Sequence, residues 1–267
     1  MDPTYWHKQS SDKPLYDDLI WSRPENKATA GKLLIIGGNA HGLTAPGIAY
    51  QAAAKAGVGT AHVLLPDAIR KAIGNSFDEG EFVLSTPSGS FAKAAINQIL
   101  ENADWADGVL LAGDFGRNSE TAILIEDILD KYKGPLTITQ DGLDYFLSHP
   151  GKLLDRTNTL IVATLPQLQK LAQNSNPSVL VRQAMSLHAL VGIMNSWSKE
   201  RNLFLATNHL KQFITVNNGE VSTTADGEKQ DWAIPLAASA SVWWLQQPSK
   251  PFEAVTTSIF DWLGPTS

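Results

Sequence analysis

Short, continuous apolar runs alternate with helix-forming segments along most of this chain. The clearest run is KLLIIG (residues 32–37), which stops at two glycines and is followed by the helix-forming segment GIAYQAAAKA (residues 47–56). A strand that is apolar on both faces must be covered on both faces, which is typical of a parallel sheet with helices on each side. Strands that alternate with helices also favour parallel connections. We therefore predict an α/β fold, a three-layer α/β/α sandwich with a mostly parallel central sheet.

The same alternation continues to the end of the chain. The predicted strands after the first are residues 60–66, 107–113, 134–140, 158–164, 202–208 and 212–224. The predicted helices after the first are residues 90–103, 119–132, 165–173, 176–200, 231–247 and 251–263, with Thr44 and Ser90 as candidate N-caps of the two earliest helices. Asn217-Asn218-Gly219 is a hairpin turn signal, so the late strands should add an antiparallel edge. In the helix at 231–247, the neighbouring Trp243 and Trp244 should place one ring toward the core and one outward.

Residues 1–31 differ in composition from the rest of the chain. They are polar, with scattered aromatic residues and prolines. We interpret them as an N-terminal arm packed on one domain of residues 32–267, because no linker, repeat or low-complexity tract divides the remainder.

The composition excludes several classes of function. The net charge is −6 at pH 7 without a block of Lys and Arg, which argues against nucleic acid or an anionic membrane as the main partner. The chain has no cysteine, so disulfides, thiolate metal sites and a cysteine nucleophile are excluded. His188 and His209 lack ligand spacing, so no metal site is predicted. Since there is neither a signal-peptide pattern nor an apolar run of ~18 residues, we expect a cytoplasmic protein.

Glycine-rich or polar loops follow the carboxyl ends of predicted strands, where sheets of this type bind ligands. These loops are residues 37–46, 112–118, 139–146 and 163–167. The first loop offers glycines and helix N-terminal N–H groups, which suit an anion or a polar sugar, and it fits a tight turn with a buried cap equally well. It has neither the GxGxxG nor the GxxxxGK[ST] pattern. We predict a crevice lined by Asn39, His41, Ala45, Gly116, Asp141 and Thr164.

One segment, RPENKATAGKLLIIGGNAHGLTAPGIAYQAAAKAGVGTAHVLLPD (residues 23–67), carries small residues and a lysine at a characteristic spacing. They are Lys27, Gly31, Gly37, Gly38, Ala45, Pro46, Ala53, Ala56, Gly57 and Gly59. Later come GVLLAGDFGRN, LTITQDGLDYF and TLIVATLPQLQKL, in that order. In these features the chain, from about residue 23 to residue 172, resembles the ADP/ATP-dependent NAD(P)H-hydrate dehydratases. That family, of the YjeF C-terminal-domain type, belongs with the carbohydrate kinases of ribokinase-like fold.

The resemblance implies a fold, a reaction and a set of site residues. It implies a ribokinase-like fold and removal of water from the hydrated nicotinamide ring of damaged NADH or NADPH, driven by ADP or ATP, with Mg²⁺ as a candidate cofactor. The partners would be a nicotinamide nucleotide and an adenine nucleotide, and a homo-oligomer is expected. Asp231 would be the catalytic acid or base, with Asp226 as the alternative. The adenine nucleotide would lie at Gly227, Lys229 and Lys199.

The chain departs from the family pattern where the chemistry is carried. The family's GPGLG loop reads Ala112-Gly113-Asp114-Phe115-Gly116, the first Asp of its DAD is Thr139, and the histidine of its TPH is Thr164. Its GTGD, which supplies N–H groups for an anion and an Asp for the reacting hydroxyl, is absent, and the corresponding region reads TTADGEKQDW. Asp231 could instead be a simple N-cap. Two alternatives stay open: a non-catalytic nucleotide-binding or regulatory relative, and a small-molecule kinase of the same fold.

Overall fold

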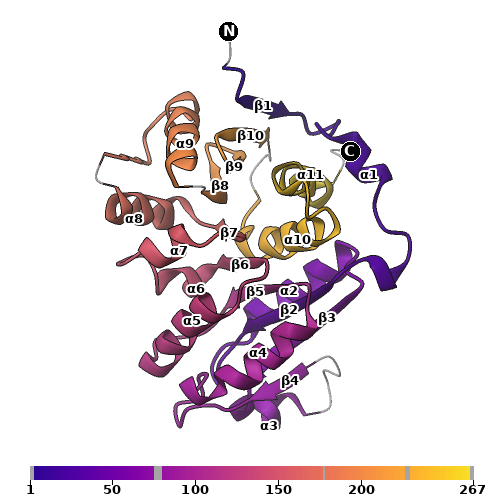
Figure 1. The fold of residues 1–267 in the computed structure, drawn as a ribbon, viewed down its shortest axis with the longest axis vertical. Coiled ribbons are helices and arrows are strands. Elements are labelled where there is room, and N and C mark those ends of the chain that lie inside the picture. Colours follow the sequence, from indigo (N-terminus) through magenta and orange to yellow (C-terminus); the bar gives the residue numbers. More distant parts are fainter. Residues whose placement is uncertain (1–2, 75–79, 177, 202, 226–228, 265–267) are drawn as a thin grey trace.

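The strands of this protein form one large sheet (Figure 1). The computed structural model describes residues 3–74, 80–176, 178–201, 203–225 and 229–264. Within these ranges the sheet has ten strands in the order β1-β10-β9-β8-β7-β6-β5-β2-β3-β4. They are β1 (Trp6–Gln9), β2 (Lys32–Gly37), β3 (Thr60–Pro66), β4 (Gly80–Val83), β5 (Gly108–Gly113), β6 (Leu136–Thr139), β7 (Thr159–Val162), β8 (Phe204–His209), β9 (Gln212–Asn217) and β10 (Glu220–Ala225). Only β9 runs antiparallel to its neighbours in the described sheet, so the predicted mostly parallel sheet is confirmed.

Helices cover both faces of the sheet. One face carries α4 (Ile96–Trp105), α5 (Ser119–Lys131), α6 (Gln140–Asp144), α7 (Gly151–Asp155), α8 (Leu165–Ser175) and α9 (Leu187–Arg201), and the other carries α2 (Thr44–Lys55), α3 (Arg70–Ile73), α10 (Ala233–Gln246) and α11 (Pro251–Leu263). Side chains of β2 alternate between the two cores: Leu34 and Ile36 pack in the first, and Leu33 and Ile35 in the second. All four are fully buried, as expected for a strand covered on both sides. The predicted three-layer sandwich is therefore confirmed.

The hairpin predicted from Asn217-Asn218-Gly219 joins β9 to β10 as expected. Asn218 has φ 48° and Gly219 has φ 88°, the left-handed conformations that a two-residue hairpin turn requires. The hairpin lies one strand in from the sheet edge, because β1 pairs with β10 on its outer side.

Part of the N-terminal segment belongs to the sheet itself. Strand β1 pairs in parallel with β10, and the Trp6 Nε1–H donates to Thr223 Oγ1 over 2.9 Å. Helix α1 (Asp17–Trp21) follows, and its Leu19 packs against Trp243. The division into an arm of residues 1–31 and a domain of residues 32–267 stays a prediction, and residues 6–9 supply an edge strand of the main sheet.

Two predicted helix starts were wrong because side-chain hydrogen bonds favour other local structures. The helix predicted at 90–103 begins only after a short 3₁₀ turn at Lys93–Ala95, and Ser90 is no cap because its N–H donates to Thr86 Oγ1. The helix predicted at 176–200 begins at Leu187. The Ser186 hydroxyl accepts from the Ala189 N–H over 3.2 Å, an N-cap contact that favours starting the helix there.

Of the two adjacent tryptophans, Trp244 packs in the sheet core and Trp243 packs on the other side of the helix, against Leu19 of the N-terminal segment. Trp243 is 0% exposed and Trp244 is 5% exposed. The Trp243 Nε1–H donates to Asp261 of α11, while Trp244 packs edge-on against Phe204 of β8. Because α1 and α11 cover the outer side of α10, this helix is enclosed on all sides.

No helix in the described part of the chain is long and apolar enough to cross a membrane.

Candidate functional site

The predicted site loops meet at one end of the sheet, where the parallel strands have their carboxyl ends. Strands β7, β6, β5 and β2 are consecutive neighbours and parallel, so their carboxyl ends lie together there. Thr164 follows β7, Asp141 follows β6, Gly116 follows β5, and the segment Asn39–Ala45 follows β2. The structure therefore brings the loops that carry all six predicted crevice residues to the end where α/β sheets bind ligands.

Asp114 ties the loop after β5 to the loop after β2. Its backbone carbonyl accepts from Asn39 Nδ2 over 2.6 Å, and its Oδ2 accepts from the Ala45 N–H over 2.7 Å. A Cβ on Gly42 would lie 3.3 Å from the Asp114 Cγ, so the carboxylate packs closely against this loop. Asp114 caps the first turn of α2, and Thr44, the predicted cap, is a residue of the helix with no such contact.

Asn39 also shapes its own loop. Its Oδ1 accepts from the His41 N–H over 2.7 Å, an Asx-type turn that leaves the His41 side chain exposed. The nitrogen of the Asn39 amide thus holds the loop after β5, and its oxygen shapes the loop after β2. The exposed His41 side chain can face a ligand.

Asp141 holds the loop after β5 from its other side. Its Oδ2 accepts from the Gly116 N–H over 3.0 Å, and the Tyr145 hydroxyl donates to the Gly116 carbonyl over 2.5 Å. The other carboxylate oxygen, Oδ1, is buried and has no hydrogen-bond partner in the described residues. Burial raises the pKa of the Asp141 carboxyl, and the nearby Asp114 charge raises it further.

Thr164 is held by the side chain of Gln167, in the first turn of α8. Its N–H and its hydroxyl donate to Gln167 Oε1 over 3.1 and 3.0 Å. The amide nitrogen of Gln167 donates to the Gln140 carbonyl over 2.8 Å, which links the loop after β7 to the loop after β6. The four loops are thus joined in a continuous series of hydrogen bonds.

Two glycines let the central strands approach each other at this end. A Cβ on Gly37 would lie 2.5 Å from the Gly113 carbonyl oxygen. Gly113 has φ 121°, and its Cβ would lie 2.8 Å from the Gln140 Cβ. Asp114 was visible in the sequence as an acid after Gly113. Its contact with the Ala45 N–H of α2 was not predicted, because it depends on this packing of the strands.

Asp231 precedes the late helix as predicted. Strand β10 runs in the same direction as β7 and β8, so its carboxyl end, Ala225, lies at the same end of the sheet and the chain passes from there to α10. Asp231 is exposed, has φ 50° and makes no cap hydrogen bond, and the N-cap position of α10 is Trp232. Asp226 and Gly227 lie outside the described residues.

The two predicted nucleotide-binding lysines have other surroundings. The Lys229 Nζ lies 3.3 Å from the Trp262 carbonyl oxygen and over the Trp262 ring, at the end of α11. The Lys199 Nζ lies 5.6 Å from the Tyr5 ring centroid, and a Cβ on Gly219 would collide with the Lys199 stem. The turn at Gly219 precedes the amino end of β10, and the crevice loops follow the carboxyl ends of the parallel strands. The structure therefore does not bring Lys199 together with the crevice loops.

In the part of the chain that the structure describes, no group of three or more His, Asp or Glu is placed to hold a metal ion. Asp114 and Asp141 are both engaged by backbone N–H groups.

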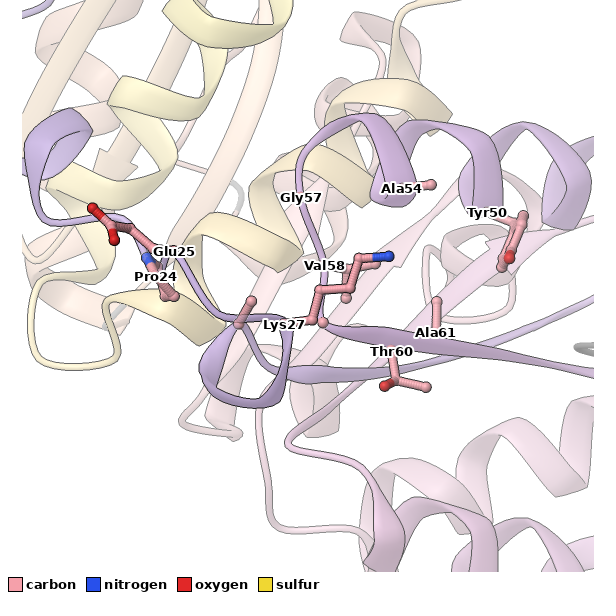
Figure 2. Close-up of a pocket in the computed structure, with 11 residues that line it drawn as sticks. Pro24, Glu25, Lys27, Tyr50, Ala54, Gly57, Val58, Thr60 and Ala61 are labelled. Atoms are coloured by element: carbon pink, nitrogen blue, oxygen red, sulfur yellow. The ribbon is translucent and has the colours of Figure 1, made fainter.

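One cavity of the described structure lies away from the crevice loops. Figure 2 shows this cavity of about 440 Å³ between the turn at Lys27, the end of α2 and the start of β3, near Thr60. It opens at the amino ends of β2 and β3, away from the crevice. A smaller apolar cavity of about 150 Å³ adjoins the loop after β2, lined by Leu43, Pro46, Gly47, Val63, Leu65 and Ile73. We assign the site to the carboxyl end of the sheet because that is where this class of sheet places its ligands and where the polar loops converge.

The comparisons with known proteins agree with the fold. No protein-family model matches the chain. A bifunctional NAD(P)H-hydrate repair enzyme from Methanothermobacter thermautotrophicus is 34% identical over 122 residues, which cover 44% of this chain and 23% of the enzyme. A ribokinase-like superfamily protein from Enterococcus faecalis has a TM-score of 0.70 at 13% identity, over 98% of this chain and 88% of that one. An ADP/ATP-dependent NAD(P)H-hydrate dehydratase from Bacillus subtilis, co-crystallised with ATP and Mg²⁺, has a TM-score of 0.62 at 12% identity, over 92% and 86% of the two chains.

The chain therefore has a ribokinase-like fold, as its sequence predicts. It is a distant relative of the bifunctional NAD(P)H-hydrate repair enzymes, and the similar region spans about a quarter of the length of those enzymes.

Proposed function

We propose that this protein is an ADP- or ATP-dependent dehydratase of hydrated NADH or NADPH. The observation that carries the proposal is the convergence of four loops, each corresponding to a family motif, at one end of a ribokinase-like sheet. The sequence similarity to an NAD(P)H-hydrate repair enzyme supports the substrate class.

In this proposal Asp231 is the acid or base. It is exposed at the entry to α10, so its carboxylate is free to meet a ligand hydroxyl. The first turn of α10 has no side-chain cap in the described structure, and free N–H groups at a helix N-terminus favour an anion. The nucleotide phosphates would lie there, and Lys229, in the segment before the helix, would reach them by leaving the Trp262 ring. The bound nucleotide would bring any Mg²⁺ with it.

The crevice loops would hold the hydrated nicotinamide part. Asn39 and Asp141 fix the loops, and His41, which is exposed, is available to orient the ligand. Thr164 stands where the family has a histidine, so the chain would offer a hydroxyl there in place of an imidazole.

A non-catalytic relative is the second candidate, and one observation favours it. The Asp114 carboxylate accepts the hydrogen bond of the Ala45 N–H, so this N–H is not available to a ligand. The family's GPGLG loop has no acid at this position. A kinase of the same fold needs the same anion-binding helix start, so the loss of GTGD counts against it equally.

The test is dehydration of the hydrate of NADH by the purified protein with ATP or ADP. Asp231→Asn should lower the rate by ~10²–10⁴-fold, because it removes acid–base help while leaving the fold intact. Asp226→Asn is the matched control for the competing assignment and should retain activity. If the unaltered protein dehydrates neither hydrate with either nucleotide, while ADP or ATP still raises its Tm, the non-catalytic candidate replaces the enzyme.

A further inference from the structure

Two acids set the charge of the crevice, and one of them, Asp114, stands in a loop where the family motif has no acid. Asp114 presents its carboxylate between the loops after β2 and β5, where its Oδ2 accepts the Ala45 N–H over 2.7 Å. Asp141 presents a second carboxylate on the other side of the same loop, bound to the Gly116 N–H. The buried Asp141 Oδ1 has no hydrogen-bond partner in the described structure, so this acid is not neutralised by a neighbouring cation.

Basic side chains hardly offset these acids. The four loops, residues 37–46, 112–118, 139–146 and 163–167, contain Arg117 and no lysine. Arg117 is exposed, and the acids Asp114, Asp141 and Asp144 come from the same loops. A phosphate entering between the loops would meet like charges and would find the first-turn N–H of α2 already occupied.

We propose that Asp114 is a specificity-determining residue that keeps phosphate out of this crevice and admits an uncharged group with hydroxyl or N–H donors. Within the proposed function, on which this inference rests, the uncharged hydrated ring enters between the loops. The phosphate groups of the ligand stay outside, on the side of the α10 N-terminus. A carboxylate at residue 114 accepts hydrogen bonds from hydroxyl and amide donors, which a hydrated ring with a carboxamide carries and a phosphate dianion lacks.

Asp114→Gly tests the inference because it should remove the carboxylate without straining the chain. Asp114 has φ 60°, a conformation that glycine adopts at no steric cost, so the variant should fold. It frees the Ala45 N–H and removes one negative charge. The probe is inorganic phosphate at constant ionic strength, measured by thermal shift and by isothermal titration calorimetry, without nucleotide or hydrate.

The unaltered protein should show little phosphate-dependent stabilisation, and Asp114→Gly should bind phosphate about tenfold more tightly or better. Asp114→Asn, which keeps the capping oxygen and loses the charge, should gain a smaller amount. Asp104→Asn is the matched control, because Asp104 is an exposed acid of α4 outside the four loops, and this variant should change nothing.

Two results would overturn the inference: phosphate binding by the unaltered protein as tight as by Asp114→Gly, or no gain in either Asp114 variant. Because the readout is phosphate binding alone, it is independent of whether the protein dehydrates anything. A failure of the proposed reaction and a failure of this inference are therefore seen in different experiments.

Discussion

Arg156→Met should be strongly destabilising, because the Arg156 guanidinium joins three segments of the chain. It donates to the carbonyl oxygens of Tyr132 and Gly134 over 2.8 and 2.7 Å, and to Thr159 Oγ1 over 2.6 Å. The Tyr132 carbonyl ends α5, and Thr159 begins β7. The charge is partly buried, and this burial lowers the pKa of Arg156. Methionine keeps much of the apolar stem and leaves these acceptors without a donor.

The expected loss follows from the hydrogen bonds to a charged donor. Each such bond is worth about 1.5–3 kcal/mol, the bonds are not additive, and water can reach part of the site. We expect a loss of about 3–5 kcal/mol in the free energy of unfolding, against a total of about 5–15 kcal/mol for a domain. Urea denaturation followed by circular dichroism measures it.

The matched control is Arg201→Met. Arg201 pairs with Asp155 over 3.2 Å, but the two side chains are 41% and 68% exposed, so this ion pair should contribute about 0–1 kcal/mol. If Arg156→Met loses no more than Arg201→Met, the idea that the guanidinium holds these three segments together is wrong.

Two further predictions concern the site loops. The raised pKa of Asp141 means that the unaltered protein loses stability as the pH rises above the ordinary carboxyl pKa. The free energy of unfolding of Asp141→Asn, relative to that of the unaltered protein, should therefore increase with pH from about pH 4 upward. A difference that does not vary with pH in thermal denaturation would contradict this. Gly113→Ala should lower the free energy of unfolding by about 1–3 kcal/mol and abolish ligand binding at the crevice. Residue 113 has φ 121°, and the new Cβ would lie 2.8 Å from the Gln140 Cβ. Gly151→Ala, in a helix with nothing within 4 Å, is its control and should be neutral or stabilising when both variants are compared by urea denaturation and ligand titration.

Much of the fold could be predicted because its information is local. The run Lys32–Gly37 is apolar on both faces, and such a strand is stable only between two helical layers. Asn218-Gly219 adopts left-handed conformations that few other residue pairs accept, so the hairpin was visible in the sequence. That the four candidate loops lie at one end of the sheet was predictable too, since parallel neighbouring strands end on the same side.

The errors arose where distant segments compete with local preference. Trp243, the outer ring of the Trp243-Trp244 pair, is fully covered by α1 and α11, and no pattern within α10 shows which segments make those contacts. The helix at Leu187 starts late because Ser186 caps it.

The sequence by itself determined the α/β/α sandwich, because apolar periodicity is a property of neighbouring residues, and it carries the motifs by which the chain resembles the NAD(P)H-hydrate dehydratases. Only the tertiary structure decided that Asp114 reaches the N–H of Ala45 and that Lys199 lies away from the crevice loops. The physical reason is that a hydrogen bond between residues 69 positions apart depends on how β2 and β5 pack, and the Gly37–Gly113 approach that sets this packing becomes visible only when both strands are in place.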